Sequence, residues 1–221
     1  MHTLPTPAPI TTVLDIPAAR IQLIAADRTD TTVQIQPANP SKNRDVKAAE
    51  QTTITHDDDV LRIQAPTPKN QAFGPSGSIE ITIQLPTGSH LQAKAASAEL
   101  RGVGRLGNVT FEAAQGPVKL DETANAHLTL LDGDVSIGRL GGPAQIRTQK
   151  GDIDIAQATH GTVELRTESG DITISAAPGA SASLDAATPD GRIHNALKND
   201  GATTLDIHAT TSHGDITARS L

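Results

Sequence analysis

Four aspartates stand at the same place in a short phrase that recurs along the second half of the chain. Each follows a glycine directly: Asp134, Asp152, Asp171 and Asp215. Carboxylates in one column on neighbouring strands lie ~4.8 Å apart and repel each other, and a divalent cation such as Ca²⁺ would remove that repulsion. The Ca²⁺-binding nonapeptide Gly-Gly-x-Gly-x-Asp has paired glycines and a residue between glycine and aspartate, which this phrase lacks. We therefore predict that the column caps turns and that the chain holds no metal, with these four aspartates as the only metal candidates.

A second group of residues could do hydrolytic chemistry. A carbohydrate-cleaving β-helix needs acidic and basic side chains that face one another on one sheet, and the repeat register brings four such side chains together. They are Arg147, Arg166, Glu164 and Asp185. The alternative is a ladder of cross-strand ion pairs, each contributing tenths of a kcal/mol. The ladder is favoured, so no catalytic residue is predicted, and an enzyme stays the second hypothesis.

The remaining motifs carry little chemistry. Residues 102–107 read G-x-G-x-x-G, with Asp121 about 20 residues further on, but a dinucleotide site requires this motif to open a helix. Here a strand pattern follows, and Gly-Arg-Leu-Gly recurs at 138–141 as a corner turn. Residues 56–59 (His-Asp-Asp-Asp) form an acidic turn between two strands more simply than a metal site. No cofactor is predicted.

The elements that position these residues are short strands in an internal repeat. Apolar residues five and seven positions before each phrase alternate with polar ones, and this period predicts a half-buried strand. Phe111 lies in one of these apolar columns, so we expect it to be buried. Each unit of 17 to 23 residues is thus two strands and two turns, and only stacked units can bury a continuous apolar face. The phrase begins at Gly133, Gly151, Gly170, Gly191 and Gly214, with weaker copies at Gly116 and Ala98.

The fold class follows from this repeat. We predict an all-β chain that forms a single right-handed β-solenoid, flattened, with two main sheets. Residues 89–221 are its regular rungs, and residues 1–88 are irregular rungs that extend and cap it. Within the irregular part, 19–23 are a decayed copy of the phrase, 45–51 are a turn or two of helix, and 66–77 are a loop by composition.

Three stretches of this sequence resemble a bacterial family of β-strand-repeat proteins that is labelled a "putative adhesin" domain of unknown function. They are Ser169–Ile174 (SGDITI), Leu85–Gly88 (LPTG) and Ala26–Pro37 (ADRTDTTVQIQP). The resemblance covers roughly residues 10–221 and implies a β-helix-like solenoid. It also implies membrane attachment for many members, and it implies no catalytic residues.

Composition argues against several kinds of partner. The chain has no Trp, Tyr or Cys and only two Phe, so it lacks aromatic platforms for sugars or bases and has no thiolate chemistry. Its 18 Lys and Arg against 25 Asp and Glu leave a net charge of −7, which opposes nucleic acid and anionic membranes. The first residues show neither a basic nor an apolar leader, and no run is long enough to span a bilayer. We expect no membrane insertion and a cytoplasmic location.

These observations favour a non-enzymatic, rigid binding or scaffold module that presents an extended β surface to a protein partner. Two alternatives remain: a carbohydrate-active β-helix enzyme built on the Arg147 group, and a Ca²⁺-stabilised, adhesin-like surface protein built on the aspartate column. We also expect an end-to-end homodimer through the C-terminal rung, residues 204–219. The reason is that an open solenoid end exposes unpaired backbone groups.

Overall fold

The structure is a computed structural model that describes residues 2–65 and 77–221. The loop predicted at 66–77 lies outside the described residues, except for Gly77. Over the described residues the fold is all-β, as predicted, with one short helix, and the chain divides into two compact units, residues 1–116 and 117–221. In the part of the chain that is described, no helix is long and apolar enough to cross a membrane. The right-handed winding and its continuity through both units stay predictions.

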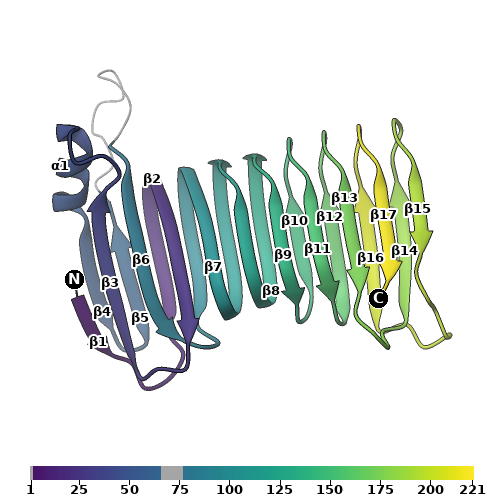
Figure 1. The fold of residues 1–221 in the computed structure, drawn as a ribbon, viewed down its shortest axis with the longest axis horizontal. Helices are drawn as coiled ribbons and strands as arrows, with labels where there is room; N and C mark the ends of the chain where they lie inside the picture. The colour runs from purple at the N-terminus through teal and green to yellow at the C-terminus, as the bar shows by residue number, and fades with distance from the viewer. Residues whose placement is uncertain (1, 66–76) are drawn as a thin grey trace. The chain divides into compact units, whose positions relative to one another are not determined.

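Strand β2 (Thr11–Ala26) organises the first unit (Figure 1). Its first part pairs in parallel with β5 (Val60–Gln64) and with β7 (His90–Gln115). Its second part pairs in parallel with β6 (Ile79–Pro86) and again with β7. The copy of the phrase expected at 19–23 is confirmed, because these residues lie directly opposite the weak copy that begins at Ala98.

The rest of the first unit departs from the parallel repeat. Helix α1 (Asn43–Gln51) begins two residues before the predicted helix, and it lies beside β3. Its Asp45 is buried and accepts a hydrogen bond from the Ser78 amide at 3.1 Å. Three strands pair antiparallel: β3 (Asp30–Pro37) on β6, β1 (His2–Pro5) on β3, and β4 (Thr53–Asp57) on β5.

The second unit consists of two parallel ladders. One ladder runs β8–β10–β12–β16–β14, and the other runs β8–β9–β11–β13–β17–β15. Successive side chains alternate between the interior and solvent, as the period of two requires. The strands are β8 (Val118–Asp132), β9 (Val135–Leu140), β10 (Ala144–Arg147), β11 (Ile153–Ala158), β12 (Gly161–Arg166), β13 (Ile172–Ala176), β14 (Ala182–Ala187), β15 (Ile193–Ala196), β16 (Leu205–Thr210) and β17 (Ile216–Ser220).

The interior is built from aligned apolar columns. In one column of the second unit, four side chains lie opposite one another on adjacent strands and are completely buried: Ile137, Ile155, Ile174 and Ala218. In the first unit Phe111 is completely buried, as predicted. Burying a Phe or Ile side chain contributes about 1.5–3 kcal/mol each, so these columns hold the rungs together.

The spatial order of the rungs differs from their order in the chain. The last rung, β16 and β17, lies between β12/β13 and β14/β15 (Figure 1). Strand β16 pairs with β12 on one side and with β14 on the other, and β17 likewise pairs with β13 and β15. The repeat register alone had placed the rungs in chain order, and that expectation is wrong for the last two.

Burial gives the physical reason for the inserted rung. Ile207 and Ile216 belong to the last rung, and both are completely buried because that rung lies between two others. The outermost rung offers a poorer apolar column, because Asn195 stands where its neighbours have Ile or Ala, and Ile193 is 47% exposed. Placing the rung with a polar interior residue at the end leaves Asn195 in water, where its amide needs no buried partner.

The insertion also corrects the predicted dimer. We expected residues 204–219 to form the open end of the array, because no polar cap follows them in the sequence. That premise is wrong: both edges of β16 and both edges of β17 are paired within the chain. The rung at the edge is β14/β15, which therefore serves as the atypical terminal repeat that such arrays use.

Engineered cysteines test this order directly, because the chain has no cysteine of its own. Glu164 and His208 lie directly opposite on adjacent strands, and Asp185 lies one strand further away. We expect Glu164→Cys with His208→Cys to form a disulfide on mild oxidation. Glu164→Cys with Asp185→Cys should not, because ~9.6 Å between strands exceeds disulfide reach. Peptide mass spectrometry detects either disulfide. A disulfide between positions 164 and 185, with none between 164 and 208, would show that the rungs follow the order of the chain.

Candidate functional site

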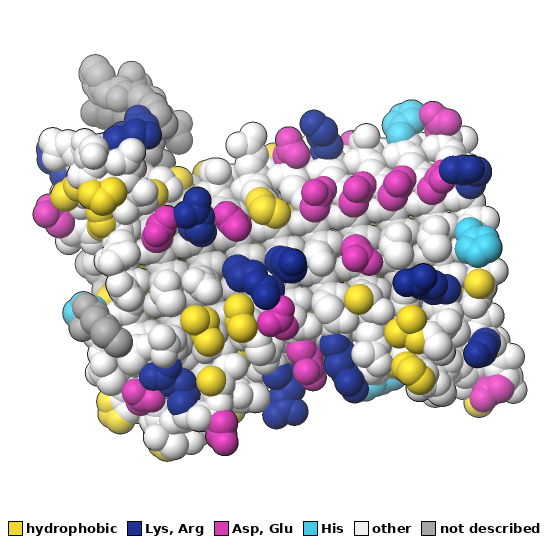
Figure 2. Space-filling model, in the orientation of Figure 1, with side chains coloured by type: hydrophobic (Ala, Val, Ile, Leu, Met, Phe, Trp, Pro, Cys, Tyr) yellow, Lys and Arg dark blue, Asp and Glu magenta, His cyan; other side chains and the backbone are white. Residues whose placement is uncertain are grey.

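The aspartate column forms a ladder of side chain–backbone hydrogen bonds. The Oδ1 of Asp134 accepts a hydrogen bond from the Asp152 amide at 2.9 Å, and the Oδ1 of Asp152 accepts one from the Asp171 amide at 2.8 Å. The Asp171 carboxylate likewise receives the Asp215 amide at 2.7 Å. Figure 2 shows a line of acidic side chains across this part of the surface. Each carboxylate caps the next rung rather than its own turn, and this pairing reduces the mutual repulsion of the column.

Threonine and glycine form a second ladder at the same corner. The hydroxyl of Thr167 donates to the Gly151 carbonyl at 3.1 Å, and that of Thr211 donates to the Gly170 carbonyl at 2.9 Å. Gly151 has φ +136°, and a Cβ there would lie 2.3 Å from the Gly133 carbonyl oxygen. The repeated glycine is therefore required because the backbone of the preceding rung approaches too closely for a side chain.

The column ends at Arg192, which occupies the aspartate position of the outermost rung. Its amide donates to Asp215 Oδ1 at 2.9 Å, and its guanidinium donates to Asp215 Oδ2 at 2.6 Å. The hydrogen bond from the Arg192 side chain is the main reason why the pKa of the Asp215 carboxyl is lowered. The positive charge of Arg192 thus lies at the end of the row of four aspartates.

The histidines do not assemble a metal centre. Within the described ranges, no three His, Asp or Glu side chains come together as metal ligands. Residues 56–59 form the acidic end of the β4–β5 hairpin, as predicted, with Asp58 at φ +49°. His208 lies 3.6 Å from Asp185, and His213 lies 3.2 Å from Asp190 at an isolated bridge outside the strands.

The G-x-G-x-x-G stretch at 102–107 lies inside strand β7. A Cβ at Gly104 would lie 2.2 Å from the Ala25 carbonyl oxygen, so this glycine allows β7 to approach β2 closely. The prediction that the motif continues as a strand and does not open a helix is confirmed. Its glycines therefore serve packing, and the phosphate-cradling geometry of a dinucleotide site is not formed.

The group proposed for carbohydrate chemistry is only partly assembled. Arg147 and Arg166 lie directly opposite on β10 and β12, as predicted, and Arg147 lies 3.8 Å from the Glu164 carboxylate. Asp185 is not beside Glu164, because the inserted strand β16 places His208 between them. The predicted four-residue cluster is therefore wrong in one member. Sequence reasoning missed His208 here because nothing local reveals the insertion.

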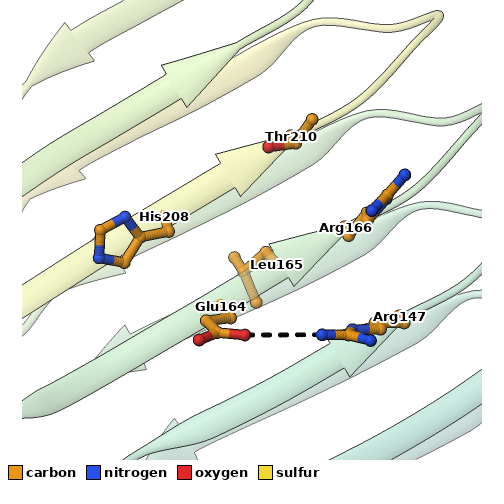
Figure 3. A pocket seen from close by; sticks show the side chains of 6 residues that line it. All are labelled: Arg147, Glu164, Leu165, Arg166, His208 and Thr210. Carbon is orange, nitrogen blue, oxygen red and sulfur yellow. Dashed lines mark ion pairs between the residues drawn. The ribbon is translucent and has the colours of Figure 1, made fainter.

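These residues belong to one outward-facing surface, which we call the ladder face. It is the solvent side of the β8–β10–β12–β16–β14 ladder. Two shallow hollows lie on it, of about 290 and 310 Å³, and Glu164 lines both. The first hollow is shown in Figure 3 and is lined by Arg147, Glu164, Leu165, Arg166, His208 and Thr210. The second is lined by Ala126, His127, Pro143, Ala144, Gln145, Thr162 and Glu164.

Polar contacts link the strands across this face. Gln145 Nε2 donates to Glu164 Oε2 at 2.8 Å, and the Ser183 hydroxyl donates to Asp206. Side chains in each row are spaced by one strand, ~4.8 Å, on a backbone fixed by both corner ladders. The arrangement can offer several polar groups at set intervals to a partner.

Comparison with known proteins identifies the family. The profile described as Toastrack DUF4097 matches residues 12–219, almost the whole chain. The chain belongs to the Toastrack DUF4097 family. The match confirms the family resemblance found in the sequence, which covers nearly the same residues. Among curated proteins, no match was found.

Several solved structures are similar to this Toastrack chain. A "putative adhesin" from Bacteroides fragilis is 16% identical over 98% of this chain and 95% of its own, with a TM-score of 0.53, and so shows the same fold. A "putative lipid binding protein" from Parabacteroides distasonis is 13% identical over 97% and 95%, with a TM-score of 0.47. A "putative cell adhesion protein" from Clostridium sporogenes is 11% identical over 100% and 98%, with a TM-score of 0.42.

The Asp215–Arg192 contact predicts how stability depends on pH. Because the folded pKa of Asp215 is lowered, its contribution is present above the unfolded pKa of about 3.9 and is lost as pH falls through the folded value. We expect the Tm of the parent chain to fall more between about pH 4 and pH 2 than that of Asp215→Asn. Asp154→Asn, an exposed residue on the other ladder, is the control and should follow the parent. Identical curves for all three proteins would contradict this role.

Metal removal tests the calcium alternative for the same column. Since Asp134, Asp152 and Asp171 each already accept a backbone amide, we expect EDTA to leave the Tm unchanged. Added CaCl₂ should not raise it. A fall of several degrees that calcium reverses and magnesium does not would show that the column binds Ca²⁺ as well.

Proposed function

We propose that this chain is a non-enzymatic binding module that presents the ladder face to a protein partner. The observation that carries the proposal is the ladder face itself. Its outward side chains stand in rows on adjacent parallel strands, and alternate residues beneath them are buried, as Val163 and Leu165 are. Because the backbone beneath is fixed, a partner can bind with little ordering cost on this side.

The character of the face supports a protein partner. It carries His, Gln, Thr, Glu, Arg and Asp side chains, and its two hollows are shallow. A mixed polar surface of this kind resembles the surface of transient protein–protein contacts. Sugar recognition commonly uses aromatic platforms, and this chain has no Trp or Tyr. The Bacteroides fragilis protein of the same fold is described as an adhesin, which is also a binding role.

Site-specific photo-crosslinking tests the proposal. A photoreactive residue is placed at Thr162 or Ser183 on the ladder face, and at Asp154 on the other ladder as the matched control. In cells that naturally produce the chain, we expect both ladder-face positions to cross-link to the same protein, identified by mass spectrometry. The control position should not. Equal cross-linking from both ladders, or none from the ladder face, would contradict the proposal.

A further inference from the structure

Arg20 and Arg192 each pair with acidic side chains on neighbouring strands or rungs. Arg20 on β2 lies between Glu80 on β6 and Glu99 on β7, at 2.5 and 3.2 Å. Arg192 is paired with Asp215 in the same way. Alternation of sign is what stable sheets favour, because like charges directly opposite each other are destabilising.

Arg147 and Arg166 place two like charges directly opposite each other instead. They lie directly opposite each other on the adjacent parallel strands β10 and β12, one strand spacing apart. The carboxylate that lines the same hollow, Glu164, is 3.8 Å from Arg147 and also accepts a hydrogen bond from Gln145 at 2.8 Å. Arg166 has no acidic partner among residues 2–65 and 77–221. Two adjacent guanidinium groups thus share a single, loosely placed counter-charge.

Both arginines line the hollow of about 290 Å³ on the ladder face. In Figure 3 they lie on adjacent strands on the same side of the hollow, and Glu164 lies beside Arg147. Thr210 continues the row, directly opposite Arg166 on β16. This side of the hollow therefore offers two guanidinium forks and a hydroxyl, which are all hydrogen-bond donors.

We propose that this hollow binds carboxylate side chains of an acidic segment of the protein partner. The inference rests on the proposed function and specifies the chemistry of its partner. A carboxylate between Arg147 and Arg166 would accept charge-assisted hydrogen bonds from both guanidinium groups. It would also supply the missing counter-charge. The overall charge of −7 disfavours non-specific binding of an acidic partner to the rest of the surface.

Glu164 sets the strength of binding. It is the acidic residue of the hollow, and an incoming carboxylate competes with it for Arg147. The site is therefore weak for a single carboxylate and selective for a segment that brings several. Removing the charge of Glu164 should strengthen binding, which a purely structural role of the two arginines would not produce.

Titration of the full chain with short peptides tests the proposal. The probe is a capped (Gly-Glu)₃ peptide, with capped (Gly-Gln)₃ as its neutral control, followed by NMR of arginine Nε–H groups and by calorimetry. We expect saturable binding of the Glu peptide in roughly the millimolar range and none of the Gln peptide. Arg166→Gln should weaken binding about ten-fold, and Glu164→Gln should strengthen it several-fold. Arg139→Gln, an exposed arginine of the other ladder, should leave it unchanged.

Several outcomes would overturn the proposal. One is that the Glu peptide does not bind at about 10 mM. Another is that Arg166→Gln and Arg139→Gln weaken peptide binding equally. A third is that inorganic phosphate or galacturonate binds saturably and the peptide does not. The substituted side chains are exposed and the substitutions are conservative. Measuring the Tm of each variant checks that it folds. If Thr162 still cross-links its partner in an Arg147→Gln, Arg166→Gln chain, the proposed function stands and the acidic contact is wrong.

Discussion

Hydrogen bonding between stacked rungs at one corner is the constraint on which the second unit depends. Aspartate carboxylates accept the amides of the next rung, and threonine hydroxyls donate to glycine carbonyls of the neighbouring rung. The glycine is required because the backbone of the preceding rung leaves no room for a Cβ. A single rung satisfies none of these groups and cannot bury its apolar face, so the rungs form only together.

The same regularity determines the chemistry of the surface. Stacking in register turns each outward position into a row, and a row of like charges must be neutralised by something. Hydrogen bonds from backbone amides stabilise the aspartate row, which ends at Arg192. In the row that contains Arg20, the arginine stands between two glutamates. Arg147 and Arg166 are two like charges directly opposite each other, and they line one of the two hollows of the ladder face.

The inserted C-terminal rung shows how such an array manages its end. An edge strand exposes unpaired backbone groups, and an apolar edge exposes core side chains as well. Here the rung with the polar interior residue Asn195 is outermost, and the more apolar rung that follows it in the chain is covered on both sides. Edge protection is thus obtained by reordering two rungs rather than by adding a capping helix.

The sequence by itself determined the strands, their inward columns, the burial of Phe111, the short helix and the turn at 56–59, because these follow from local periodicity and turn chemistry. The family resemblance was also readable from repeated phrases. Only the tertiary structure decided which rung neighbours which. All rungs have nearly the same columns of inward apolar residues, so the sequence pattern fits both the chain order and the inserted order of the rungs. The folded chain has the inserted order, which buries Ile207 and Ile216 and leaves Asn195 exposed. For the same reason the sequence placed Asp185 beside Glu164, where His208 lies, and it could not show that each aspartate caps the amide of the next rung.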